Sequence, residues 1–177
     1  MLFSFRGQAT HTSAVSLART LGLMNYRRGV PADAENIAAL IASFQRELTD
    51  DPSGTGAEQY LASVTVDAEC KYLLSDRYFF TLAIAEIGLA GFIAIRDRSH
   101  IFHLFVSKPF QAIGLARRLW TLASVPEDAT IAPPRYTVNS SLNAVPVYKA
   151  LGFVPTSGIA HVHGISFLPM QLIVQAQ

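Results

Sequence analysis

The sequence predicts a single α/β domain of the α+β kind, and two observations support this class. Short runs rich in β-branched and aromatic residues alternate with segments whose apolar residues recur at helical spacing. Their order is strand, helices, three strands, helix, strand, helix and two strands. In addition, half of the 177 residues are hydrophobic and 15% are charged, which is typical of a globular domain with a full core.

The N-terminal half of the predicted domain contains a strand, helical segments and a hairpin. Pro31 ends the first strand, and Asp33 can cap the helix that follows. The apolar stripe of that helix is Ile37, Leu40, Ile41, Phe44 and Leu48. The other predicted elements are a strand over 26–30, helices over 58–66 and 68–74, and strands over 78–85 and 90–96 that form the hairpin.

The C-terminal half continues with strands and two helices. Leu115, Leu119 and Leu122 recur at helical spacing, so a helix starts near 115. Gly152 can end the last helix as its C-cap. The predicted elements are a strand over 101–106, a helix that ends before Pro126, a strand over 136–138, a helix over 144–150, and an antiparallel pair over 153–156 and 165–174.

Composition and charge limit the classes of partner. With 14 basic and 13 acidic residues the net charge is +1, which gives no electrostatic case for nucleic-acid binding. Cys70 is the single cysteine, so an internal disulfide is excluded and a reducing, cytoplasmic setting is expected. No apolar run reaches the roughly 18 residues that a membrane helix requires. We therefore expect neither nucleic acid nor a membrane as a partner.

Residues 1–24 differ from the rest of the chain. They contain Arg6 and Arg19, no acid and several Ser and Thr residues, a composition loosely similar to that of an organelle transit peptide. Because Met24 directly precedes the first predicted strand, an alternative start codon or an appended arm explains the segment at least as well. We expect an N-terminal arm over 1–24 and one domain over 25–177, and we leave targeting open.

The strongest single signal is the strand, loop and helix between residues 101 and 122. The loop starts at Gln111, contains Gly114 and leads directly into the helix. The first N–H groups of a helix have no internal partners, and the helix dipole adds partial positive charge there. This arrangement is typical of a phosphate or pyrophosphate cradle, although the loop matches neither common Gly-rich nucleotide motif.

A second block, residues 136–153, makes this signal more specific. The loop matches Gln/Arg-x-x-Gly-x-Gly/Ala through Gln111, Gly114 and Ala116. The second block matches Asn-x-x-Asn-Ala-x-x-x-Tyr-x-x-x-Gly-Phe, with the first Asn one residue further upstream, through Asn139, Asn143, Ala144, Tyr148, Gly152 and Phe153. Together the two blocks resemble the acetyl-CoA-binding motifs of the GNAT superfamily of N-acetyltransferases. The resemblance covers residues 25–174.

This resemblance implies a mixed, mostly antiparallel sheet of six to seven strands, with a central, splayed parallel pair and about four flanking helices. We expect a distortion within 101–107 that opens the splay, since bulges commonly redirect the backbone beside active sites. The family transfers an acetyl group from acetyl-CoA directly to an amine, so Cys70 is not needed as a nucleophile. Acetyl-CoA is the expected cosubstrate, no metal is expected, and a homodimer is a family-level expectation.

The resemblance also assigns cofactor-binding residues. The pyrophosphate is expected on backbone N–H groups of the loop, and the pantetheine arm on the exposed backbone of Phe105 and Val106, where an N–H would polarise the thioester carbonyl. Asn139 can hydrogen-bond the cofactor amide or an ordered water, whereas Asn143 is interpreted as mainly structural, as a helix N-cap. The loop residues are Gln111, Ala112, Ile113, Gly114, Leu115 and Ala116.

Tyr148 is the candidate general acid, since family members commonly place a Tyr hydroxyl near the CoA sulfur. A phenol with a pKa of ~10 is protonated at neutral pH and can donate as thiolate charge develops. The general base is left open among Glu86, His103 and a relay through water. His161 and His163 would share one face of a strand, but no Cys or carboxylate lies nearby in sequence to complete a metal site.

The leading hypothesis is therefore an N-acetyltransferase that moves the acetyl group of acetyl-CoA to a primary amine of a small molecule or peptide. Acids within 44–60 would suit a cationic amine, although exposed helix and loop acids are the ordinary interpretation. The alternative is a non-catalytic regulatory module that binds acetyl-CoA or CoA. A toxin-type member that acetylates aminoacyl-tRNA would favour a basic surface, which the charge balance does not support.

Overall fold

The computed structural model describes residues 23–124 and 135–174, and its strands form one mixed sheet. The sheet has eight strands in the order β1-β2-β3-β4-β5-β8-β6, and β7 pairs with β8. Within the described residues β4 and β5 are the one parallel pair, so the mostly antiparallel sheet predicted from the sequence is confirmed. The strands are β1 (Asn25–Arg28), β2 (Tyr78–Ala85), β3 (Gly88–Arg96), β4 (His100–Val106), β5 (Arg135–Ser141), β6 (Val154–Pro155), β7 (Ala160–Val162) and β8 (Ile165–Ile173).

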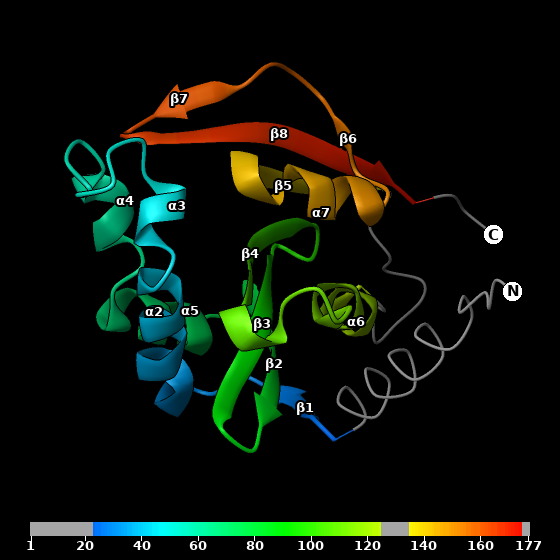
Figure 1. Ribbon diagram of the computed structural model, residues 1–177. Helices are drawn as coiled ribbons and strands as arrows, with labels where there is room; N and C mark the ends of the chain where they lie inside the picture. Colours follow the sequence, from blue (N-terminus) through cyan, green and yellow to red (C-terminus); the bar gives the residue numbers. More distant parts are fainter. Residues whose placement is uncertain (1–22, 125–134, 175–177) are drawn as a thin grey trace, which may run out of the picture.

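Helices cover both faces of this sheet. Figure 1 shows α2 to α5 gathered on one side of the strands β2 to β4 and α6 on the opposite side. The described part contains more elements than expected, because one predicted helix is split in two and the short strand β7 pairs with β8. The α-helices are α2 (Ala34–Ala42), α3 (Gln45–Leu48), α4 (Glu58–Ala62), α5 (Val66–Leu74), α6 (Leu115–Ala123) and α7 (Val145–Ala150).

The predicted helix after Asp33 is interrupted at Phe44, between α2 and α3. At this break the Phe44 ring packs against Phe105, with ring centroids 5.8 Å apart. Asp33 does not cap α2 through its side chain, which corrects the interpretation from sequence. Instead its carboxylate accepts hydrogen bonds from Arg27 and from the backbone N–H of Val30, and the Arg27 pairing lowers the pKa of Asp33.

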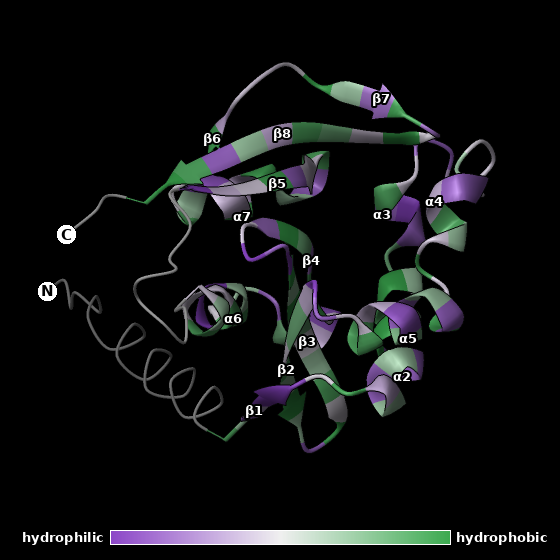
Figure 2. Cartoon of the chain, turned by 180° about the vertical axis from the view of Figure 1, so that it is seen from behind, coloured by the Kyte–Doolittle hydropathy of each residue, from purple (hydrophilic) through white to green (hydrophobic). Residues whose placement is uncertain are grey.

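Two apolar clusters, one on each face of the sheet, hold the helices in place. Figure 2 shows hydrophobic and hydrophilic residues on different sides of α2, α5 and α6, as expected for helices that bury one face. Burial of such faces is the main favourable term in folding. On the α2 side the buried residues include Ile37, Ile41, Phe80, Leu82 and Phe92, and on the α6 side they include Leu115, Leu119, Tyr148, Phe153 and Met170.

The parallel pair β4–β5 opens after two residue pairs. His100 lies opposite Thr137 and Ile101 lies opposite Val138, and beyond these pairs the two strands no longer bond each other. From there β4 continues along β3, while β5 continues along β8. The predicted splay is therefore present, and it leaves one edge of β4 unpaired in the middle of the sheet.

A β-bulge lies at the start of this opening. On β3 the neighbours Ala94 and Ile95 pair with His103 and Ile101, so Phe102 is an extra residue on β4. A bulge bends its strand and increases the local twist. The distortion predicted within 101–107 is thus located at Phe102.

The predicted N-terminal arm falls almost entirely outside the described residues. Its last residue, Met24, is buried in the cluster on the α6 side, directly before β1. Within 23–124 and 135–174, no helix has the length and apolar character needed to cross a membrane.

Candidate active site

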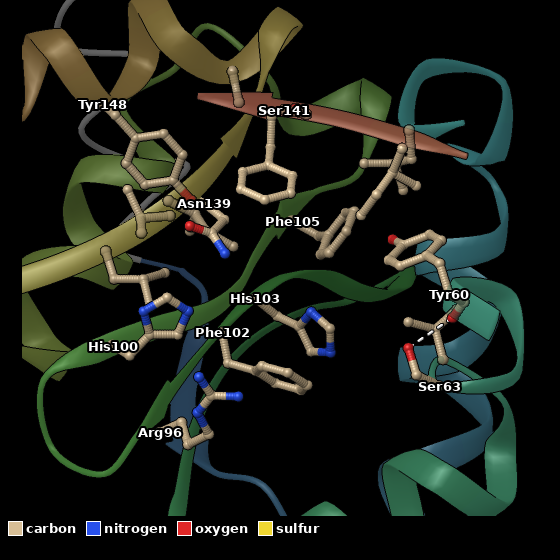
Figure 3. A pocket seen from close by; sticks show the side chains of 18 of the residues that line it. Tyr60, Ser63, Arg96, His100, Phe102, His103, Phe105, Asn139, Ser141 and Tyr148 are labelled. Atoms are coloured by element: carbon tan, nitrogen blue, oxygen red, sulfur yellow. Dashed lines mark hydrogen bonds between the residues drawn. The ribbon is translucent and has the colours of Figure 1, made fainter. Parts of the chain in front are cut away.

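A cavity of about 270 Å³ lies where β4 and β5 diverge (Figure 3). Its walls come from α4 and the chain after it, from β3, β4 and β5, from α7 and from the start of β8. Tyr148 belongs to the apolar cluster on the α6 side, whereas Phe102 and Phe105 belong to the cluster on the α2 side. The cavity therefore joins the two faces of the sheet through the opening between the strands.

The loop that follows β4 presents free backbone N–H groups beside this opening. Ala112 has φ +59° and Gly114 has φ +87°, so the chain turns through two left-handed residues before α6 begins. The N–H groups of Ala112, Ile113 and Gly114 have no acceptor within the described residues. The first turn of α6, from Leu115 and Ala116 onward, adds N–H groups that no helix can satisfy internally. These groups can hold an anion such as a pyrophosphate.

Gln111 plays a different part from its neighbours in the loop. Its backbone N–H donates to the carbonyl of Lys108 at 3.3 Å. Its side-chain amide donates to the carbonyl oxygen of Val106 at 3.0 Å, although the side chain is exposed. Gln111 therefore covers one backbone acceptor at the end of β4, where the pantetheine arm was expected. The Phe105 ring, by contrast, lines the cavity and stacks on Phe92.

Tyr148 places its hydroxyl in the cavity. The ring is 5% exposed and packs edge-on against Phe153. Figure 3 shows the hydroxyl directed toward the Asn139 amide, which also faces the cavity. Within the described chain the hydroxyl has no hydrogen bond, and burial raises the pKa of Tyr148 well above its ordinary value. The hydroxyl is thus a proton donor at neutral pH.

The two asparagines of the second motif have different surroundings. Asn139 lies on β5 opposite Pro169 of β8 and lines the cavity. Asn143 does not cap α7, which corrects the sequence interpretation, because Ala144 occupies the N-cap position. The Asn143 side chain instead donates a long bond of 3.5 Å to the carbonyl of Glu47, at the end of α3.

His103 is the one predicted base candidate that lines the cavity. It lies on β4, is buried, and its Nε2 is 3.0 Å from Oε1 of Glu69. A carboxylate can only accept, so Nε2 carries a proton in this pair, and the opposite ring nitrogen, Nδ1, makes no hydrogen bond within the described residues. Figure 3 shows the His103 ring between Phe102, Phe105 and Tyr60. Glu86, in contrast, lies in the exposed turn between β2 and β3 and does not line the cavity.

Sequence reasoning missed Glu69. It lies on α5 and is completely buried, and its Oε2 has no hydrogen-bond partner within the described residues. Burial of Tyr60, with a smaller contribution from the charge of Glu69, raises the pKa of Tyr60 to about 12. The sequence did contain one signal for Glu69. It stands three residues before Tyr72 and four before Leu73, so it lies on the apolar side of the helix. An acid in that position needs a buried partner.

Arg96 and His100, also not predicted, lie at the other end of the cavity. His100 Nδ1 is 2.8 Å from the hydroxyl oxygen of Thr137, across the parallel pair. Burial, with a smaller contribution from the charge of Arg96, lowers the pKa of His100 to about 4. His100 is therefore neutral at neutral pH, and Arg96 carries the charge at this end.

The rim of the cavity is tied together by polar contacts from distant segments. The Ser166 hydroxyl donates to the carboxylate of Asp50 and lies 2.7 Å from Nδ1 of His161.

His163 lies in the turn between β7 and β8, with φ +49°. In the described ranges, His, Cys, Asp and Glu side chains form no group of three or more that could hold a metal ion.

A family model described as an acetyltransferase (GNAT) domain matches residues 48–174, which include the loop, the cavity and Tyr148. No protein with curated functional information matches the chain.

Solved structures share this fold over most of the chain. A GCN5-related N-acetyltransferase from Rhodopseudomonas palustris has a TM-score of 0.66 at 17% identity, over 85% of this chain and 96% of the other. The PaiA N-acetyltransferase from Thermoplasma acidophilum, in complex with coenzyme A, has a TM-score of 0.61 at 14% sequence identity, over 85% of this chain and 99% of the other. A variant of spermidine N-acetyltransferase from Vibrio cholerae has a TM-score of 0.57 at 14% sequence identity, over 86% of this chain and 94% of the other. At these identities the likeness shows the fold alone.

Proposed function

Since the chain belongs to the GNAT acetyltransferase family and is therefore an acyltransferase, we propose that it transfers an acetyl group directly to a primary amine held in the cavity. The observation that carries this proposal is the cavity itself. It is lined by both Tyr148, the candidate proton donor, and His103, the candidate proton acceptor, and it lies beside a loop rich in free N–H groups.

Acetyl-CoA fits the residues around this opening. The free N–H groups of Ala112, Ile113 and Gly114 suit its pyrophosphate, and the unpaired edge of β4 suits the amide-bearing pantetheine arm. When bound, acetyl-CoA supplies an electrophilic thioester carbonyl. Exposed N–H groups on β4 near Phe105 are the candidates for polarising it.

On one side of the opening Tyr148 acts as the general acid. Its burial keeps the phenol protonated, so it donates a hydrogen bond where negative charge develops on a leaving sulfur. Asn139 lies close enough in the cavity wall to orient a water or an amide beside that hydroxyl.

On the other side His103 acts as the general base. Its Nδ1 lone pair takes a proton from the acceptor ammonium, because Nε2–H is committed to Glu69. The buried Glu69 carboxylate fixes this tautomer and stabilises the imidazolium that forms, as a carboxylate does behind the histidine of a catalytic triad. Glu69 is thus a positioning residue.

The decisive experiment measures free-thiol release from acetyl-CoA against a panel of amines, with wild type and Tyr148→Phe. We expect amine-dependent release, and kcat about 100-fold lower in the variant because a general acid is removed. Tyr136→Phe is the matched control. Tyr136 is equally buried at 5% exposure, but its hydroxyl donates to the carbonyl of Ser124, away from the cavity.

Calorimetric titration with acetyl-CoA separates the alternatives. Binding without release for any amine would favour the non-catalytic regulatory module. No binding at all would contradict the assignment of the loop to the pyrophosphate. A Tyr148→Phe variant with unchanged kcat would remove Tyr148 from the mechanism and leave the transferase activity standing.

A further inference from the structure

Arg96 gives the cavity a charge that the proposed chemistry does not use. Among the lining residues that the structure describes, it is the one with a permanent charge, and none is acidic. The other polar groups of the lining are hydroxyls, an amide and two histidines. An acceptor that fills the cavity therefore meets an arginine at one end.

Within the described residues this arginine makes one long ion pair, with Asp97, and its side chain makes no hydrogen bond. Its Nε is buried and has no hydrogen-bond acceptor within the described residues. The carboxylate beside it, Asp97, is 3.7 Å away and is already bonded through both oxygens to Arg77, at 2.8 and 2.7 Å. The Arg96 guanidinium lies over the Phe102 ring, 5.5 Å from its centroid, which orients it along the cavity wall (Figure 3). A planar guanidinium held in this way is suited to a carboxylate.

The cavity is also electrically polarised. Its middle holds His103 with the buried carboxylate of Glu69 directly behind it, and its end holds Arg96. His100 adds no charge of its own next to Arg96, since it is neutral at neutral pH. An acceptor whose ammonium lies at His103 would complement both ends only if it also carried an anionic group.

The phosphates of the cosubstrate are too distant to be the ligand of Arg96. Arg96 pairs with His100 at the first residue of β4, whereas the N–H-rich loop follows Val106 at its last. At ~3.3 Å per residue these two ends of the strand lie ~20 Å apart. In the proposed reaction the acceptor is therefore the remaining source of an anionic group at this end of the cavity.

We propose that the acceptor amine carries a carboxylate, as in an amino acid or short peptide, and that Arg96 binds this carboxylate. This assignment rests on the proposed function and names the substrate class of the same site. A polyamine should then be a poor acceptor, because it would bring only further positive charge to Arg96.

Matched acceptors test the assignment. Each pair consists of an amino acid and the amine that lacks its carboxylate: phenylalanine with phenethylamine, and 6-aminohexanoate with pentylamine. For the wild type, kcat/KM should be about 30- to 100-fold higher for the better-fitting amino acid than for its amine, as expected for a charge-assisted bond. In Arg96→Gln this ratio should fall to about 1, through a lower kcat/KM for the amino acid.

Arg28→Gln is the control variant, because Arg28 is exposed, lies over an aromatic ring as Arg96 does, and does not line the cavity. It should keep the wild-type ratio. If the wild type shows no preference for a carboxylate, or if Arg96→Gln slows both members of a pair equally, the proposal is overturned. An amine with a phosphonate in place of the carboxylate should be a poorer acceptor, with a lower kcat/KM. A higher kcat/KM for the phosphonate would contradict the assignment of a carboxylate to this site.

Binding measurements keep this test separate from the proposed activity. Calorimetry with CoA-saturated wild type should give a Kd for the preferred amino acid about 30-fold lower than for its amine, and Arg96→Gln should remove the difference. This readout requires no turnover. If no thiol is released but the amino acid binds more tightly than its amine, the transferase activity is refuted and the anion site is supported. If the amino acid and its amine bind with equal Kd, the anion site is refuted.

Discussion

Glu69 and His103 form a buried polar pair, which packing of the core alone does not require. Burying a carboxylate is costly unless it is fully bonded, and here Oε1 bonds His103 while Oε2 has no partner within the described residues. A well-packed apolar pair at this place would give an ordinary core. A buried acid bonded to a cavity-lining histidine is the pattern expected where a side chain must be oriented for chemistry.

We expect Glu69→Gln to lower kcat about 10- to 100-fold while the KM for acetyl-CoA changes little. The amide oxygen of Gln can still accept from Nε2–H of His103, but it no longer stabilises the imidazolium. Asp67→Asn, an exposed acid on the same helix, should behave as wild type. Steady-state kinetics on both variants measures the difference.

A second acceptor distinguishes base chemistry from a packing defect. An amine whose own pKa lies below the assay pH arrives unprotonated and needs no base. Glu69→Gln should therefore slow transfer to an ordinary alkylamine but not to this amine. Equal losses on both acceptors would mean that Glu69 serves folding or packing, and that a water relay removes the proton.

At the scale of the element, the turn from β4 into α6 depends on two left-handed residues. Gly114, at φ +87°, adopts this conformation at no steric cost, whereas Ala112, at φ +59°, bears a Cβ that disfavours it. The N–H groups of both residues are free and lie in the proposed pyrophosphate cradle. We therefore expect the backbone conformation of this turn to affect acetyl-CoA binding.

Gly114→Ala should destabilise the protein by about 1 kcal/mol and weaken acetyl-CoA binding, because the new Cβ opposes the left-handed turn. Ala112→Gly should relieve the same kind of strain and leave binding intact. Urea unfolding and calorimetric titration check both variants. Gly114→Ala with wild-type affinity for acetyl-CoA would show that the turn does not position the phosphate-binding groups.

At the scale of the molecule, the rim of the cavity depends on a contact between segments more than 100 residues apart. The carbonyl of Gly164, in the β7–β8 turn, accepts from the backbone N–H of Asp50 at 2.8 Å. A Cβ at Gly164 would lie 2.5 Å from the backbone of Gly56, and its φ is +69°. The turn and the loop after α3 thus meet backbone to backbone, and the start of β8 is held over the cavity.

Gly164→Ala should destabilise the protein by about 2 kcal/mol, since the added Cβ meets both a steric clash and an unfavourable φ. Faster exchange of the Asp50 amide hydrogen should accompany it. Gly158→Ala is the control, because nothing lies within 4 Å of a Cβ at that position. Urea unfolding and hydrogen exchange measure both effects, and a Gly164→Ala variant as stable as Gly158→Ala would contradict this account of the rim.

The sequence by itself determined the features that depend on short stretches of chain. The strand–loop–helix at 101–122, the β2–β3 hairpin and the helix that carries Tyr148 follow from local periodicity, turn residues and motif spacing. The parallel splay, by contrast, was expected only from the family resemblance that the two motifs carry. Their residue types carry the family resemblance without any knowledge of distant contacts.

Tertiary structure alone decided which distant side chains meet. The Glu69–His103 bond joins α5 to β4, and Arg96 lines the cavity while Arg77 bonds both oxygens of Asp97. Such contacts depend on the strand register, which the Phe102 bulge shifts by one residue, and on how helices pack across the sheet. A one-residue shift moves a side chain to the opposite face, so pairing across the sheet cannot be obtained from local pattern.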